Sequence, residues 1–443
     1  MHLSSRAKLL IGLAIVVVLA AYVYQALGPS VWSKVTPQIP QIFIDTLLLG
    51  NLYFLIAVGI TMTFTVAKFA NFAHGDVATV GAYAAYLLYN FAVLSGAPNG
   101  FAVQVGLVGV VSGIILTLAY LKTKNSTLMV LGPALLVMGA VVLFACYTGA
   151  NLWEATIEAM LASAVVSLLS HVLVYKPLSN RGASLVQLMV ASIGVALFIR
   201  YALYEMTWYS RQYFKQEITY QNFGVQLSNF QAWIINGTLV IANTTASFAS
   251  EYIPAIKIGA GGIAFTKLNA LDVMFKFPQP VLSFTDLYIW STLTVLAVII
   301  GMTLLFKKTK IGKAWRAVAN NPVLAAACGI DVDSVVNLAW LVAGALAGIG
   351  GLFWAIQTQI YPELGWMILL NAFAVAVLGG LGSFWGTFAA SYILAFAEQF
   401  GVSVLAAINP QYTGYRFMIP FSVFLLVLYL KPEGLAGIKT RKA

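Results

Sequence analysis

Apolar runs of about 20 residues recur along almost the whole chain, and they restrict the fold more than any other feature of the sequence. A helix rises about 1.5 Å per residue, so each run is long enough to cross a hydrocarbon core of about 30 Å. The alternating segments of about ten residues that a transmembrane β-barrel requires are absent. The sequence therefore predicts an all-α polytopic membrane protein.

The boundaries of these runs predict about twelve transmembrane helices. The expected spans are 9–27, 42–66, 77–96, 101–121, 127–148, 155–175, 184–204, 286–306, 335–358, 366–382, 385–405 and 416–431. The first span is interpreted as a retained anchor, with a signal peptide as the alternative, because its apolar run is long for a signal peptide. Broken or re-entrant helices are the alternative to full crossings around 66–77 and 382–385.

Composition supports this class, because 61% of the residues are hydrophobic and only 9% are charged. With both termini in the cytoplasm, most of the 24 Lys and Arg residues fall in cytoplasmic loops and tails, as the positive-inside rule requires. The net charge of +10 therefore reflects the basic cytoplasmic loops of a multi-pass protein in the plasma membrane. It does not indicate a nucleic-acid partner.

Four segments follow from the spans. They are an N-terminal anchor and outer loop at 1–41, a first membrane half at 42–204 with an extra, peripheral helical hairpin at about 101–150, an extracytoplasmic segment at 205–285, and a second membrane half at 286–443 with a cytoplasmic loop at 307–334. Segment 205–285 is polar and aromatic and is long for a connector, and its β-branched stretches indicate short strands. Asn236 and Asn243 head N-x-T sequons there and are candidate glycosylation acceptors.

No catalytic constellation is visible. The chain lacks a GxxxxGK[ST] nucleotide loop, its three His residues are scattered, and neither HExxH nor GxSxG occurs. Cys146 and Cys328 do not have metal-ligand spacing. The Gly-rich stretch 378–386 follows no strand and is interpreted as close helix packing. The sequence predicts a protein that is not an enzyme and that binds no metal or cofactor itself.

A few polar residues lie within or beside the apolar runs, where such groups usually face a protein interior or a solute path. The candidates for the translocation path or a helix break are Asn71, His74, Gly75, Asp76, Asn371 and Glu398. In "NFAHGD", Gly75 would permit a break, and Asp76 would either cap the next helix or line the path. Asn371 would contact solute or bridge two helices. Glu398 would line the path, pair internally or lie at the interface.

The loop at 307–334 is the most basic cytoplasmic loop. Its sequence predicts a short turn at Gly312 that carries Lys313 and Arg316. A helix then follows, with Asn321 as N-cap, Pro322 at the first position and Gly329 just beyond its end. The small residues Ala325, Ala326 and Ala327 offer a surface that another protein could approach closely. The alternative is a helix that lies on lipid headgroups.

Four motifs, in order along the chain, resemble the LivH-like permease of the branched-chain amino acid ABC importers, including their urea-type relatives. The motifs are "NFAHGD", "VYKPLSNRGASLVQLMVASIGVALFIR", "KIGKAWRAVANNPVLAAACGIDVDSVVNLAW" and "NAFAVAVLGGLGSFWGTFAASYILAFAE". This resemblance implies a vitamin-B12-importer-like permease. The paired breaks before "ATVGAYAAYLL" and "GTFAASYILAF" also suggest an inverted repeat with a site between the halves.

The resemblance also implies partners. They are a second, similar permease, two cytoplasmic ATPase subunits that hydrolyse ATP, and an extracytoplasmic solute-binding protein, all assembled in membrane lipid. It makes residues 312–329 the coupling helix that is seated in an ATPase cleft. Branched-chain or other neutral amino acids are the expected solutes, with urea or amides, or sugars or nucleosides, as alternatives. A stand-alone secondary transporter is the competing hypothesis and would depend on Asp76 and Glu398 for a coupling ion.

Overall fold

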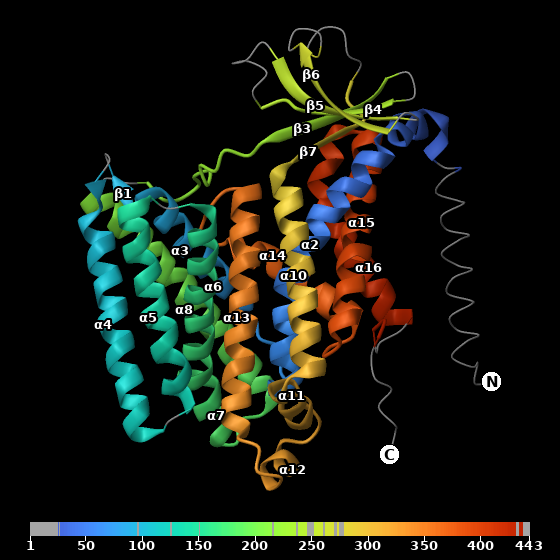
Figure 1. Ribbon diagram of the computed structural model, residues 1–443. Coiled ribbons are helices and arrows are strands. Elements are labelled where there is room, and N and C mark those ends of the chain that lie inside the picture. Colours follow the sequence, from blue (N-terminus) through green and yellow to red (C-terminus); the bar gives the residue numbers. More distant parts are fainter. Residues whose placement is uncertain are drawn as a thin grey trace, which may run out of the picture. The chain divides into compact units, whose positions relative to one another are not determined.

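Helices dominate the computed structural model (Figure 1). The structure describes residues 25, 27–94, 97–124, 126–149, 151–214, 217–235, 238–245, 252–259, 262–269, 273, 279–430 and 434–436. Most of the expected helix at 9–27 and the sequon residue Asn236 therefore lie outside the described residues. Asn243 is described and is the last residue of a strand.

Nine helices in the described part are long and apolar enough to cross a membrane. The helical elements are η1 (Thr36–Gln38), α2 (Ile39–Ala67), α3 (His74–Phe91), α4 (Gly100–Thr123), α5 (Ser126–Thr148), α6 (Leu152–Ser170), η2 (His171–Tyr175), α7 (Lys176–Asn180), α8 (Leu185–Tyr209), η3 (Ser210–Phe214), α10 (Asp286–Lys308), α11 (Lys310–Asn320), α12 (Pro322–Ala327), α13 (Val332–Gln357), α14 (Leu364–Gly379), α15 (Phe384–Ile408), η4 (Pro410–Phe417) and α16 (Met418–Leu430). Residues 27–35 are also helical and lead into η1.

The chain divides into two compact units, and each is described by itself. Unit 1 comprises residues 1–51, 226–294 and 389–443, and unit 2 comprises residues 52–225 and 295–388.

Unit 1 contains the antiparallel sheet, which accounts for the strands expected between 205 and 285. The strands are β3 (Asn229–Ile235), β4 (Thr238–Asn243), β5 (Tyr252–Gly259), β6 (Gly262–Asn269) and β7 (Leu282–Thr285), in the spatial order β6-β5-β4-β3-β7. In β3 and β4, Ala232 pairs with Ile241 and Trp233 with Val240. The buried side chains of Trp233, Val240 and Ile253 form a small core for this sheet.

Unit 2 contains the helical hairpin expected at 101–150, formed by α4 and α5, and a two-stranded ribbon, β1 (Val93–Leu94) and β2 (Ala97–Pro98). Glycines allow α4 and α5 to pack closely, because a Cβ at Gly113 would collide with Leu136 and a Cβ at Gly139 would collide with Val110. The outer face of the hairpin is apolar, and Val108 is 68% exposed. This pattern fits helices whose outer face is in contact with lipid.

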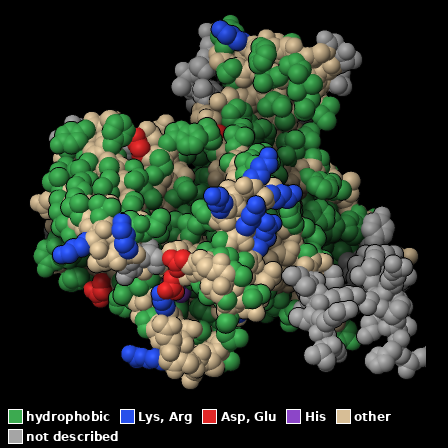
Figure 2. Space-filling model, turned by 60° about the horizontal axis from the view of Figure 1, so that its bottom comes forward, with side chains coloured by type: hydrophobic (Ala, Val, Ile, Leu, Met, Phe, Trp, Pro, Cys, Tyr) green, Lys and Arg blue, Asp and Glu red, His purple; other side chains and the backbone are tan. Residues whose placement is uncertain are grey.

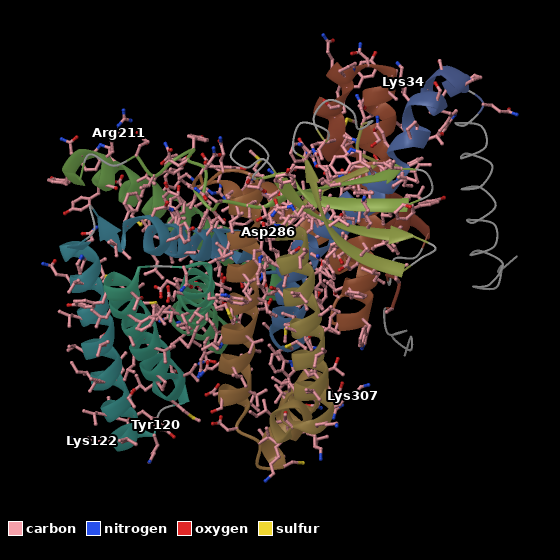
Figure 3. All side chains as sticks on the ribbon, turned by 45° about the horizontal axis from the view of Figure 1, so that its top comes forward. Lys34, Tyr120, Lys122, Arg211, Asp286 and Lys307 are labelled. Atoms are coloured by element: carbon pink, nitrogen blue, oxygen red, sulfur yellow. The ribbon has the colours of Figure 1, made fainter. Side chains whose placement is uncertain are left out.

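Basic residues gather at one end of unit 2. Figure 3 shows Lys122 at the end of α4 and Lys307 near the end of α10 at this end, with Arg211 at the opposite end. The view in Figure 2 brings the same end forward and shows Lys and Arg side chains clustered on it. Lys307 and Lys308 occupy the last turn of α10, where cations interact favourably with the helix dipole.

Candidate functional site

The site begins at the irregular segment that separates α2 from α3 in unit 2. The segment starts at Lys68, whose φ is +59°, and ends where α3 begins at His74. The Asn71 Oδ1 accepts hydrogen bonds from the Ala73 amide at 3.1 Å and from the Tyr175 hydroxyl at 3.2 Å. The Phe72 amide donates to the Ser192 Oγ on α8 at 3.0 Å. The Asn71 Oδ1 and the Phe72 and Ala73 amides are thereby satisfied within the protein, as the membrane interior requires.

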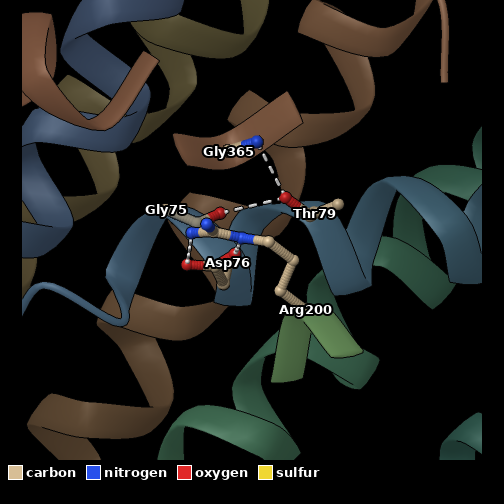
Figure 4. Close-up of polar contacts among 5 residues, drawn as sticks. All are labelled: Gly75, Asp76, Thr79, Arg200 and Gly365. Atoms are coloured by element: carbon tan, nitrogen blue, oxygen red, sulfur yellow. Dashed lines mark hydrogen bonds and ion pairs between the residues drawn. The ribbon is translucent and has the colours of Figure 1, made fainter. Parts of the chain in front are cut away.

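Asp76 is fully buried in the first turn of α3 and forms a bidentate ion pair with Arg200 on α8 (Figure 4). The Arg200 Nε donates to Oδ1 at 2.9 Å, and Nη2 donates to Oδ2 at 3.0 Å. The guanidinium also lies over the Trp366 ring of α14, 4.7 Å from its centroid. The expectation that Asp76 caps α3 is wrong, because the N-cap is Ala73 and no side chain caps it. The carboxylate instead binds a cation from a distant helix.

A close crossing of α3 and α14 adjoins this ion pair. A Cβ at Gly75 would overlap the Gly365 carbonyl, and a Cβ at Gly365 would overlap the Gly75 carbonyl. The Gly365 amide donates to the Thr79 hydroxyl at 2.8 Å, and that hydroxyl donates to the Gly75 carbonyl at 3.3 Å (Figure 4). Gly75 therefore serves the helix contact rather than the break itself. We call Gly75, Asp76, Thr79, Arg200 and Gly365 the clamp.

Two other expected site residues are buried in contacts with α2. His74 is fully buried, and its imidazole occupies the space that a Cβ at Gly59 would need. Asn371 on α14 donates to the Tyr53 hydroxyl on α2 at 2.6 Å. Of the two roles expected for Asn371, the structure shows the bridge between helices.

Glu398 lies in unit 1, in α15, and the structure shows an internal pair for it. Its Oε1 accepts hydrogen bonds from the Arg416 Nη2 at 2.8 Å and from the Arg416 Nε at 3.1 Å. The Glu398 side chain is 2% exposed, whereas that of Arg416 is 43% exposed. The ion pair therefore joins a buried carboxylate of α15 to a partly exposed guanidinium of η4.

The basic loop of unit 2 folds into α11 and α12. Asn321 caps α12 by accepting from the Leu324 amide at 3.1 Å, and Pro322 is the first helical residue. Gly329 follows with φ +80°, and the Ile330 amide donates to the Ala325 carbonyl at 3.1 Å, as in a Schellman motif. The expected caps are therefore confirmed.

The expected turn at Gly312 is instead the first part of α11. Thr309 caps this helix by accepting from the Gly312 amide at 3.0 Å, and a Cβ at Gly312 would overlap the Leu305 carbonyl. Trp315 of α11 is buried edge-on against Phe306. These contacts fix the angle between α10 and α11.

The outward surface of α12 includes Ala326 and Ala327, as expected, but not Ala325. Ala325 is only 3% exposed and faces inward. Val323 is 78% exposed and Leu324 is 62% exposed, and Ala326 is exposed beside them. A small apolar knob formed by Val323 and Leu324 therefore projects from the basic end of unit 2.

Lys68 joins this loop to the helix break. Its ammonium donates to the Ala319 carbonyl of α11 at 2.8 Å. Ala319 lies in the last turn of α11, where carbonyl groups lack intrahelical partners and attract cations. This bond joins the end of α11 to the first residue of the irregular segment between α2 and α3.

The site residues expected from the sequence did not include Arg200, Thr79, Gly365, Trp366 or Lys68. Arg200 could have been found, because it is the only charged residue in the expected span 184–204 and an intramembrane charge needs a partner. Thr79 and Gly365 have no such signal, because their contact joins positions 286 residues apart.

Chemically, the site is a set of paired groups at helix crossings. No group of three His, Cys, Asp or Glu residues that could hold a metal occurs among the described residues. The charged groups of the clamp are neutralised by each other, and the hydroxyl and amide groups join helices. Such a site can hold helices together and transmit their motion.

Comparisons with known proteins agree with this picture. The family model described as "Branched-chain amino acid transport system / permease component" matches residues 42–428. No solved structure matches the chain. The relatives include a probable branched-chain amino acid transport permease protein LivH of Methanocaldococcus jannaschii, 26% identical over 89% of this chain and 91% of its own. The high-affinity branched-chain amino acid transport system permease protein LivH of Escherichia coli is 24% identical over 88% of this chain and 92% of its own. A nucleoside ABC transporter permease protein NupB of Lactococcus lactis is 34% identical, over 26% of this chain and 33% of its own.

Proposed function

The chain belongs to the family of branched-chain amino acid transport permease components, and from this premise we propose that it is the membrane subunit of an ATP-driven importer for branched-chain or other neutral amino acids. Relatives with that description in their names match nearly the full length of the chain, whereas the nucleoside permease matches 26% of it. Amino acids are therefore the first solutes to test, before nucleosides, urea or amides.

The partners we propose are a second permease, two cytoplasmic ATPase subunits and an extracytoplasmic binding protein. The observation that carries the proposal is the α11–α12 segment. It is basic, doubly capped and closed by a Schellman motif, and it projects two apolar side chains, Val323 and Leu324, that unit 2 leaves exposed. A rigid element of this kind suits docking into a groove of another protein, because little ordering entropy is lost on binding.

The conformational change we propose starts at this knob. ATP binding in the partner would move α12 and α11, and Lys68 would carry the motion to the break between α2 and α3. The clamp ties α3 to α8 and α14, so these three helices would respond together. Access to the solute path would then alternate between the two sides of the membrane.

The experiment is co-purification of the tagged full chain with its ATPase, followed by leucine uptake in proteoliposomes that contain the binding protein. Leu324→Asp should lose both the ATPase and ATP-dependent uptake, because it places a charge in an apolar contact. Thr123→Asp is the control, because Thr123 is exposed at the same end of unit 2 but is the last residue of α4. Uptake without ATP, or normal uptake by Leu324→Asp, would overturn the proposal and favour a secondary transporter.

A further inference from the structure

Unit 2 contains a cavity of about 390 Å³ that the proposed transport cycle does not use. It lies among α3, α4, α5, α6 and α8, which Figure 1 shows grouped on one side of the unit. Its wall is mainly apolar and includes Leu87 and Phe91 of α3, Val142 of α5 and Met206 of α8. The volume falls within the range of about 300–1,000 Å³ that is typical of small-molecule sites.

One carboxyl group lies in this apolar wall. Glu158 of α6 lines the cavity and is only 6% exposed, and its Oε2 is shielded from solvent without a hydrogen-bond partner among the described residues. The start of α6 does not need Glu158, because Asn151 and Glu154 form a complete capping box. A buried carboxyl oxygen without a partner is costly, so a ligand that supplies a donor would be favoured.

The lining restricts the chemistry of that ligand. The described residues that line the cavity include no Lys, Arg or His, so an anionic or zwitterionic molecule would bury its negative charge without a partner. The Asn99 side chain already donates to the Phe91 carbonyl at 2.9 Å. The rings of Phe91 and Tyr209 belong to the same wall and favour a cation near their faces.

We propose that this cavity binds a small hydrophobic primary amine, with its ammonium on the Glu158 carboxylate and its apolar body among the side chains of α3, α5 and α8. The site lies near the end of unit 2 opposite the basic end, because Glu158 is in the second turn of α6, about 9 Å from the helix start. An amino acid does not fit this chemistry because of its carboxylate. The amine is therefore a ligand distinct from the proposed transported solute.

The test is direct binding of radiolabelled isoamylamine to the purified full chain in nanodiscs, without ATPase or nucleotide. We expect saturable binding that Glu158→Gln weakens about tenfold or more, because it removes a charge-assisted hydrogen bond. Glu205→Gln is the matched control, since Glu205 is exposed on α8 and does not line the cavity. Ala162→Phe keeps the carboxylate but fills the cavity, and it should also abolish binding.

Competition identifies the ligand class. Phenethylamine should displace the probe, whereas leucine and isoamyl alcohol, which match the apolar body but not the charge, should displace it at least about tenfold less well. The proposal fails if no saturable binding occurs, if Glu158→Gln binds as well as the wild type, or if the alcohol or leucine competes equally. Because the assay uses neither ATP nor leucine uptake, its failure would not affect the proposed import function.

Discussion

Replacing Arg200 with Met tests the clamp most directly. The substitution keeps most of the apolar length of the side chain but leaves the fully buried Asp76 carboxylate without its cation. Removing one member of a buried ion pair typically costs about 3–5 kcal/mol. The upper part of that range applies here, because the Asp76 side chain is 0% exposed, both its oxygens lose charge-assisted bonds, and the contact of Arg200 with Trp366 is lost as well.

The reverse substitution, Asp76→Asn, should cost less. Arg200 remains 13% exposed, keeps the Trp366 ring and can still donate to the amide oxygen. The double variant Asp76→Asn with Arg200→Met leaves no buried charge. Its loss of unfolding free energy should therefore be smaller than the sum of the two single losses by about 0.5–3 kcal/mol. Arg200→Met is expected to cost more than Asp76→Asn because Asp76 is the more deeply buried partner. Steric fit alone would not predict this difference.

The assay is denaturant titration of the purified protein in mixed micelles, which gives the free energy of unfolding of each variant. Arg211→Met is the matched control, because Arg211 pairs with Glu217 at 3.4 Å but both side chains are exposed. Its cost should stay below about 1 kcal/mol. Equal costs for Arg200→Met and Arg211→Met, or strict additivity in the double variant, would refute the reasoning about the clamp.

Two further predictions concern the crossing of α3 and α14 and the hydrogen bond from Lys68 to α11. Gly365→Ala should reduce both stability and uptake, because its Cβ would overlap the Gly75 carbonyl, whereas Gly194→Ala on α8 meets open space and should be neutral or stabilising in thermal unfolding. Lys68→Met should leave the fold and ATPase binding intact but reduce the leucine imported per ATP hydrolysed, since its bond to Ala319 is lost. Lys122→Met is its control, and equal transport ratios for the two lysine variants would contradict the proposed link.

The helices of this protein could be predicted closely from the sequence because the membrane permits few alternatives. Expected span 127–148 corresponds to α5 (Ser126–Thr148), and 286–306 corresponds to α10 (Asp286–Lys308). Backbone groups in lipid must be satisfied within the segment, so the length of an apolar run determines the helix. The beginning of α3 at His74, before the expected residue 77, shows where this logic weakens. Polar residues in a first turn look like a loop when their partners are unknown.

The site could be predicted only in part, because its contacts join distant positions. The motif "NFAHGD" indicated a break, and the structure contains one, but Asp76 pairs with a residue 124 positions away. The local sequence pattern can suggest a helix cap, but it cannot reveal an ion pair between residues that are far apart in the sequence. Glu158 could not be predicted as a buried group for the same reason. It lies in the expected span 155–175, but its burial depends on five helices that come together only in the fold.

In the proposed transport cycle, the contacts around the break would restrict how a solute passes. The Asn71 Oδ1, the Phe72 amide and the Asp76 carboxylate all have hydrogen-bond partners inside unit 2 in this conformation. A solute could contact these groups only by replacing their present hydrogen bonds. The free-energy cost of that replacement is lowest when the bonds to the solute form as the present bonds break. Lys68 lies at the start of the same segment and is held by α11. In the proposed transport cycle, movement of α11 would therefore break the Lys68 bond and loosen the segment that contains these groups.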